Sequence, residues 1–380
     1  MAQSFETSTV HFGLDQETVN RSKTTPIYQT SVFSFKNLEE LEAHYTGERA
    51  YLYTRMGNPN TDELGQAVAQ LENAQAGVAS SSGISAIMAG VLAVCKTGDH
   101  LIASEDVYGG TYHFLQNQLL DMGITVSFVD FSSPVEMEKA ITEKTKLLFS
   151  ESITNPFLRV EDLRAMVKLA QKHNLVTMID NTFATPYLVQ PIELGIDLVA
   201  HSATKYNGGH SDVTAGVMVG SSSLIEKVRQ KVVSWGANVS PFEAWLACRG
   251  IKTLALRMEK QCDNAAKLAD YFRQHPAVEK VFFPKGVSEK GNGAMVTIEL
   301  QPDVDMNRFF SSLTWIKIVP SLAGVETTVS YPIATSHRSL PEEQQKKLGI
   351  TEHVVRISVG IEKFDDIKLA FENALEFAKK

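Results

Sequence analysis

Short apolar runs alternate with amphipathic segments between residues 61 and 245. The runs are bounded by polar residues or glycine, which is typical of buried strands. They predict strands at Gly77–Ala79, Leu101–Ser104, Thr125–Val129, Lys146–Phe149, Val176–Ile179, Asp197–Ala200 and Gly216–Val219. The intervening segments predict helices, among them Ile84–Val94, Val135–Thr142 and Leu163–His173. Strands that alternate with helices indicate an α/β fold with a mostly parallel sheet, which binds ligands beyond the carboxyl ends of its strands.

The two ends of the chain have a different pattern. Residues 1–60 are polar and irregular, and we expect an N-terminal arm that packs on the body or on another subunit. Residues 61–245 are predicted to form a large domain, and residues 246–380 a smaller α+β domain. In the smaller domain the pattern predicts helices at Thr253–Gln274 and Phe364–Ala378, and strands at Val278–Phe282, Ala294–Glu299 and Val354–Val359.

Composition narrows the class of protein. The 380 residues are 43% hydrophobic and carry a net charge of −8, without a basic cluster that would indicate nucleic-acid binding. No apolar stretch approaches the roughly 20 residues that a membrane span needs, and the first residues do not resemble a signal peptide. The three cysteines, Cys95, Cys248 and Cys262, form no CxxC pair, which fits a reducing compartment. We therefore expect a soluble cytoplasmic protein.

The motifs of several common enzyme classes are absent. The sequence contains no GxxxxGK[ST] phosphate loop, no GxGxxG dinucleotide fingerprint, no HExxH zinc motif and no GxSxG nucleophile elbow. The histidines show no spacing typical of a metal site, so we expect no metal. The usual hydrolytic and redox templates are thereby disfavoured.

Three features with chemical potential follow predicted strands. Ser80-Ser81-Ser82-Gly83-Ile84 lies between a strand and a helix and could bind a phosphate at the helix N-terminus, although such turns more often only connect elements. Asp180 ends an apolar strand, where it could pair with a cation or simply cap a turn. Lys205 follows a strand among hydroxyl and glycine residues, where it could be a nucleophile or a solvated charge.

Together these features match the needs of pyridoxal phosphate. That cofactor requires a phosphate cradle, a lysine that forms a Schiff base and an acid at the ring nitrogen. An aromatic ring usually covers its face, and Tyr108 in Asp106-Val107-Tyr108-Gly109-Gly110 is the candidate.

The ordered motifs resemble the Cys/Met-metabolism family of pyridoxal-phosphate enzymes over nearly the whole chain, and bacterial cystathionine β/γ-lyases in particular. The motifs are Tyr53-Thr54-Arg55 with Gly57-Asn58-Pro59, SSGISA at 81–86, DVYGGTY at 106–112, ESITNP at 151–156, IDNTFATP at 179–186, HSATKYNGGHSD at 201–212, RGIKTLALRM at 249–258, SLAGVET at 321–327 and RISVGIE at 356–362. The resemblance implies the aspartate-aminotransferase-like fold, fold type I. It also implies a homotetramer made of two catalytic dimers.

The resemblance assigns roles residue by residue. Lys205 would form the Schiff base and shuttle protons, and Asp180 would pair with the pyridinium nitrogen. Tyr108 would stack on the ring and act as a catalytic residue in proton transfer. Asn155 would lie near the ring's phenolic oxygen, with Glu151 close by. The phosphate would be held by Gly83, Ile84, Ser202 and Thr204, and by Tyr53 and Arg55 of a neighbouring subunit. Arg356, helped by Ser321, would bind the α-carboxylate of a sulfur amino acid substrate.

The family contains several reactions, and few residues separate them. Gly110 stands where methionine γ-lyases carry a cysteine, and Pro320 stands where γ-lyases and γ-synthases usually have a glutamate. We therefore expect a carbon–sulfur lyase acting on cystathionine or cysteine, with β-elimination favoured. Cystathionine γ-lyase, cystathionine γ-synthase and O-acyl-homoserine sulfhydrylase remain alternatives, and methionine γ-lyase or an aminotransferase is less favoured.

Overall fold

The computed structural model describes residues 3–13, 22–47, 51–338 and 342–379. Its larger sheet has the strand order β1-β7-β6-β5-β4-β2-β3. The strands are β1 (Ala76–Ser80), β2 (His100–Ser104), β3 (Thr125–Val129), β4 (Thr145–Glu151), β5 (Val176–Asp180), β6 (Leu198–Ser202) and β7 (Gly216–Gly220). Only β7 runs antiparallel to its neighbours in this sheet. The predicted mostly parallel α/β sheet is confirmed.

Successive residues of the central strands pack on opposite faces of this sheet. Ile179 and Val199 belong to one buried cluster, together with apolar residues of α3 (Pro59–Glu72). Met178 and Leu198 belong to a second cluster, together with residues of α4 (Gly83–Val94). Burial on both faces explains why these strands read as continuous apolar runs.

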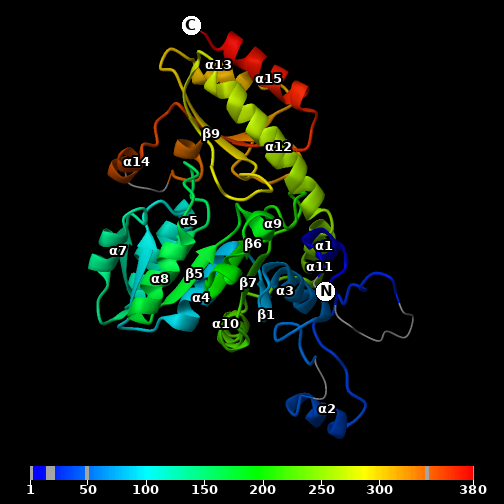
Figure 1. Ribbon diagram of the computed structural model, residues 1–380. Coiled ribbons are helices and arrows are strands. Elements are labelled where there is room, and N and C mark those ends of the chain that lie inside the picture. The colour runs from blue at the N-terminus through cyan, green and yellow to red at the C-terminus, as the bar shows by residue number, and fades with distance from the viewer. Residues whose placement is uncertain (1–2, 14–21, 48–50, 339–341, 380) are drawn as a thin grey trace.

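Other helices surround the sheet (Figure 1). They are α7 (Pro134–Ala140), α8 (Leu163–His173), α10 (Ser222–Trp235) and α11 (Pro241–Ile251), with the short α5 (Gly109–His113), α6 (Leu119–Asp121) and α9 (Thr185–Leu188). A π-helical turn spans Phe114–Gln118, and 3₁₀ turns span Pro191–Leu194 and Pro332–Ala334.

Helix α3 lies very close to β1. A Cβ placed on Gly77 would stand 2.1 Å from the carbonyl oxygen of Gly65, and one on Gly65 would stand 2.7 Å from that of Gly77. Two glycines therefore permit this approach, because any side chain would collide with backbone.

A second sheet lies in the C-terminal part and has the order β10-β11-β12-β9-β8. Its strands are β8 (Val278–Phe282), β9 (Met295–Leu300), β10 (Lys317–Ile318), β11 (Thr328–Ser330) and β12 (Val354–Ser358). The helices of this part are α12 (Leu254–Arg273), α13 (Met306–Ser311), α14 (Glu342–Leu348) and α15 (Phe364–Phe377). The sheet, α12, α13 and α15 share a buried apolar core.

The N-terminal region is more ordered than its irregular pattern suggested. Helix α1 (Phe5–Val10) contacts α3 and α12, and α2 (Leu38–Tyr45) stands away from the body in Figure 1. Across the described ranges, no helix combines the length and the apolar character needed to cross a membrane.

Candidate functional site

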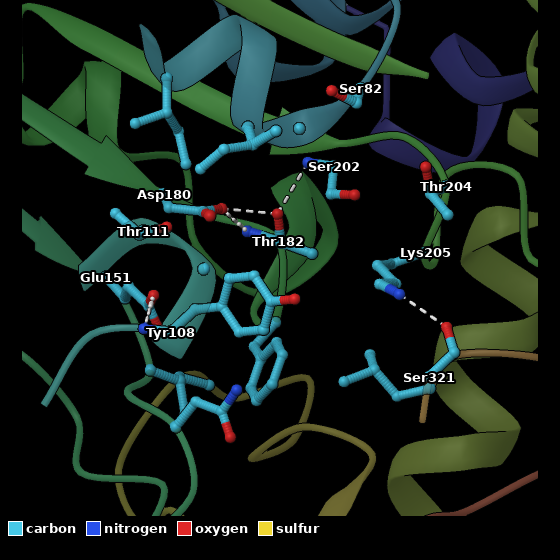
Figure 2. Close-up of a pocket in the computed structure, with 18 of the residues that line it drawn as sticks. Ser82, Tyr108, Thr111, Glu151, Asp180, Thr182, Ser202, Thr204, Lys205 and Ser321 are labelled. Atoms are coloured by element: carbon cyan, nitrogen blue, oxygen red, sulfur yellow. Dashed lines mark hydrogen bonds between the residues drawn. The ribbon is translucent and has the colours of Figure 1, made fainter. Parts of the chain in front are cut away.

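A cavity of about 300 Å³ opens at the carboxyl ends of the large sheet (Figure 2). Its walls come from the ends of β4, β5 and β6, from the start of α4, and from residues of the C-terminal part. The site residues that the sequence predicted and that line it are Gly83, Ile84, Tyr108, Glu151, Asn155, Asp180, Ser202, Thr204, Lys205, Ser321 and Arg356. The fold thus brings together side chains spread over more than two-thirds of the chain.

The start of α4 forms one wall. Ser82 caps the helix by accepting a hydrogen bond from the Ser85 backbone N–H (3.2 Å). A Cβ on Gly83 would stand 2.6 Å from Cβ of Ser202, so only glycine lets β6 pass this close. The unpaired N–H groups of the first turn and the nearby hydroxyls of Ser202 and Thr204 suit a phosphate.

Asp180 ends β5 and borders the cavity. Its Oδ1 accepts hydrogen bonds from the backbone N–H (3.0 Å) and from the hydroxyl of Thr182. Burial raises the pKa of Asp180, and the Thr182 hydrogen bonds act in the opposite direction. A cation beside this carboxylate would offset the cost of its burial.

Glu151 supports the turn that carries Tyr108. Its Oε1 accepts a hydrogen bond from the Tyr108 backbone N–H (2.7 Å). Burial, followed by the nearby Asp180 carboxylate, raises the pKa of Glu151 well above its usual range. The ring of Tyr108 lies within the cavity region in Figure 2 and is 45% exposed, so its face is accessible.

Lys205 lies across the cavity from Asp180 in Figure 2. Its Nζ donates a hydrogen bond to Oγ of Ser321 (2.6 Å). Burial, assisted by the positive charge of Arg356, lowers the pKa of Lys205 to about 8. At pH 7 an amine with this pKa is neutral in about a tenth of the molecules, far more than an ordinary lysine with a pKa of 10.5, which makes it a better nucleophile and base.

Arg356 is a buried residue of β12 that is 2% exposed. Its Nη1 donates to Oδ1 of Asn155 (2.7 Å) and its Nε to Oγ of Ser330 (3.1 Å). Burial lowers its pKa to about 10. Its Nη2 donates to no residue in the described part of the chain, which leaves it for a carboxylate ligand.

Tyr53 and Arg55 do not line this cavity. They border a separate hollow with Asn238 and Ser240. Arg55 lies over the ring of Tyr53 (5.5 Å) and donates from Nη1 to the carbonyl oxygen of Val233 (3.0 Å). Their role at a neighbouring subunit's site stays a prediction.

Several lining residues were not predicted. Thr182 binds Asp180 and follows it by two residues, a spacing typical of local side-chain hydrogen bonds, so this partner was readable. Ile153, Phe183 and Leu322 add apolar walls. Their place in the cavity has no sequence signal, since apolar residues of this kind are usually core.

The donor set fits pyridoxal phosphate. One cavity contains a helix N-terminus with hydroxyls, a buried carboxylate, an accessible aromatic ring and an amine of lowered pKa. Among the described residues, no group of three or more His, Cys, Asp and Glu side chains is arranged to hold a metal ion.

Known proteins similar to this chain include enzymes that use pyridoxal phosphate. The model of the family described as Cys/Met metabolism PLP-dependent enzyme matches residues 6–376. The chain is 38% identical to a cystathionine β-lyase of Lactococcus lactis subsp. cremoris, covering 98% of this chain and 99% of the relative. It is 39% identical to a cystathionine γ-lyase of Bacillus subtilis, with the same coverage.

The fold has a solved counterpart. The crystal structure of cystathionine γ-lyase from Lactobacillus plantarum complexed with L-serine superposes with a TM-score of 0.93, at 36% identity and over 99% of both chains. Fold type I is therefore confirmed, and so is the enzyme class: pyridoxal-phosphate dependent, of the cystathionine-lyase type. The chain belongs to the Cys/Met-metabolism family of pyridoxal-phosphate-dependent enzymes.

Proposed function

We propose that this enzyme is a carbon–sulfur lyase that eliminates a thiol from cystathionine or cysteine, with β-elimination favoured. The products would be a 2-oxo acid, ammonia and the thiol. One observation carries the proposal: a lysine amine of lowered pKa shares a cavity with a buried guanidinium that has an unused donor. This arrangement can bind an α-carboxylate and place a base beside the same substrate.

In this proposal the cofactor is held by the cavity wall. Its phosphate would bind at the N-terminus of α4, together with the hydroxyls of Ser202 and Thr204. Its ring nitrogen would pair with Asp180, and Tyr108 would cover the face of its ring. Asn155 and Glu151 would border the phenolic edge of the ring. When bound, pyridoxal phosphate supplies an electron sink that stabilises negative charge on the substrate's Cα.

The chain's own groups then move the protons. Neutral Lys205 removes the Cα proton of the substrate, and the Ser321 hydroxyl, 2.6 Å from Nζ, orients the amine. Arg356 binds the α-carboxylate through Nη2, and the Asn155 and Ser330 hydrogen bonds fix its plane. Because the pKa of Lys205 is lowered, deprotonating this amine costs less free energy than deprotonating an ordinary lysine.

The lining residues favour β- over γ-elimination. Elimination from Cγ requires a second proton, on Cβ, to leave first, and a further carboxylate would help to bind the distal amino group of the substrate. The acids in the described lining are Glu151 and Asp180, and both already serve the cofactor side of the cavity. Pro320 offers no charge at the position next to Ser321.

The alternatives share this site. A cystathionine γ-lyase, a cystathionine γ-synthase or an O-acyl-homoserine sulfhydrylase would use the same lysine, aspartate and arginine. A methionine γ-lyase or an aminotransferase is less favoured. Analysis of the products distinguishes these reactions directly.

The proposal includes a shared active site. Tyr53 and Arg55 lie outside their own chain's cavity, and we expect them to reach the cofactor phosphate of a neighbouring subunit. This requires at least a dimer, and a homotetramer of two such dimers is the expected assembly. Residues 1–60 would then be an intersubunit arm, residues 61–245 the cofactor domain and residues 246–380 the small domain. We expect the cytoplasm as its compartment, where the three buried cysteines would stay reduced.

Products from cystathionine test the proposed reaction. Purified holoenzyme is supplied with cystathionine, and the products are resolved by mass spectrometry, with Lys205→Ala as the matched blank. Pyruvate with homocysteine supports β-elimination. Oxobutyrate with cysteine would assign γ-elimination instead. Neither product from a cofactor-loaded enzyme would favour a synthase or sulfhydrylase, for which acylated homoserines are the next substrates.

A further inference from the structure

A buried polar cluster lies behind the cofactor cavity and lines no part of it. Glu72 at the end of α3, Asn181 directly after β5 and His201 in β6 are each at most 1% exposed. Oε1 of Glu72 accepts from Nδ2 of Asn181 (2.8 Å) and from Nε2 of His201 (2.7 Å). One carboxylate oxygen therefore ties the ends of two neighbouring strands to one helix.

The register of these strands links the cluster to the cavity. Asp180 pairs with Ala200 across β5 and β6, so Asn181 and His201 come one residue later on their strands. Because successive side chains alternate between faces, the residues adjacent in sequence point to the opposite side. Asp180 and Ser202 line the cavity, whereas Asn181 and His201 reach Glu72 on the α3 side.

The two strand ends are also joined on the cavity side. The Ser202 backbone N–H donates to Oγ1 of Thr182 (2.8 Å), and that hydroxyl donates to Oδ1 of Asp180. Movement of either strand end would therefore shift both Asp180 and Ser202. These residues are the expected partners of the cofactor's ring nitrogen and phosphate.

We propose that Glu72 is a positioning residue: through Asn181 and His201 it fixes the strand ends that present Asp180 and Ser202 to the cofactor. The proposal rests on the proposed function, because that function assigns Asp180 and Ser202 their roles. Glu72 acts without touching the cofactor, and its effect is greatest on cofactor affinity.

The composition of the cluster is not that of an optimised core. Among the described residues, Oε2 of Glu72 and Oδ1 of Asn181 are buried without a hydrogen-bond partner. Such atoms are costly to bury, and apolar residues of the same shape would fill the space without that cost.

Cofactor affinity tests the proposal. We expect Glu72→Ala to weaken the equilibrium binding of pyridoxal phosphate about tenfold or more, since a charge-assisted hydrogen-bond pair is lost. Binding is followed by dialysis and by the visible absorption of the lysine-bound cofactor. Glu72→Gln keeps an acceptor oxygen for both donors and should recover most of the affinity.

His100→Gln is the matched control. His100 is a buried imidazole in the same sheet, bonded to Thr145 (2.8 Å) and Ser127 (3.0 Å), at the amino end of β2. It should change thermal stability but not cofactor affinity. Where Glu72→Ala does not fold, Asn181→Ala and His201→Ala each remove one arm of the cluster and should weaken binding in the same direction.

The outcomes separate the two proposals. If folded Glu72→Ala, or both single-arm variants, bind the cofactor as tightly as the wild type, Glu72 is not a positioning residue. A weakening by His100→Gln equal to that by Glu72→Ala would also overturn the inference. If the wild type itself forms no lysine-bound cofactor, the proposed function fails, whatever the variants do.

Discussion

Single residues of the cavity carry reactivity through burial and one or two fixed partners. Lys205 and Arg356 are both cations of lowered pKa, and burial is the main cause for each. Each of the two buried cations donates a hydrogen bond to a polar side chain, Lys205 to Ser321 and Arg356 to Asn155, which offsets part of the cost of burial. Changes of pH, and substitutions at single residues of the cavity, should therefore alter cofactor binding and turnover.

We expect the pKa of Lys205 to set the rate of cofactor capture. The amine must be neutral to attack the cofactor's aldehyde, so capture by apoenzyme should accelerate as pH rises through about 8 and then level off. Stopped-flow absorption at a series of pH values measures this rate. Continued acceleration towards the ordinary lysine value of 10.5 would show that burial does not lower the pKa of this group.

Gly110 leaves space for the Tyr108 ring. A Cβ at this position would stand 2.6 Å from Cε1 of Tyr108, so Gly110→Ala must displace the ring. We expect kcat to fall about tenfold, because misplacing a group in the reaction cavity is costly. Steady-state kinetics measure this fall in kcat, with Tyr108→Phe as the comparison variant because it keeps the ring in place. A wild-type kcat in Gly110→Ala would contradict this account.

At the scale of elements, the close packing of α3 on β1 fixes the distance between this helix and the edge of the large sheet. Gly77→Ala would place a Cβ against the backbone of Gly65, and we expect the free energy of unfolding to fall by about 1–3 kcal/mol. Gly57→Ala is the control, since its Cβ would meet its nearest neighbour at an ordinary 3.6 Å. Denaturant unfolding of both variants tests this, and equal stabilities would argue against the close contact.

The sequence predicted the buried elements well because apolar runs and helical spacing are local signals. The predicted bounds Thr125–Val129 and Leu163–His173 match β3 and α8. The short β10 and β11 and the helices of the N-terminal region were missed, since a strand of two or three residues carries no periodicity. The start of α3 was readable, because Asn58 caps it and Pro59 opens it.

The site was predictable to the extent that its residues end consecutive strands. Asp180, Ser202 and Lys205 meet because parallel strands end at one edge. The Glu72 cluster was not predicted, because its partners are 109 and 129 residues away in sequence. Contacts at that separation follow only from the topology.

At the scale of the whole molecule, the proposed assembly places Arg55 of one subunit at the site of another. Mixing the Lys205→Ala and Arg55→Ala variants should then restore activity, because a hybrid dimer contains one site with neither substitution. Turnover and cofactor retention of the mixture, after the subunits have been exchanged, are compared with each variant alone. Absence of recovery in confirmed hybrids would place Arg55 in its own chain's site or outside any site.

The central claim is that Lys205 is the residue that binds the cofactor covalently in this cavity. Borohydride reduction of the holoenzyme fixes the cofactor to its lysine, and peptide mass spectrometry after digestion locates it. The account predicts the pyridoxyl group on Lys205 and on no other lysine. A modified peptide elsewhere in the chain, or none after saturation with pyridoxal phosphate, would contradict it.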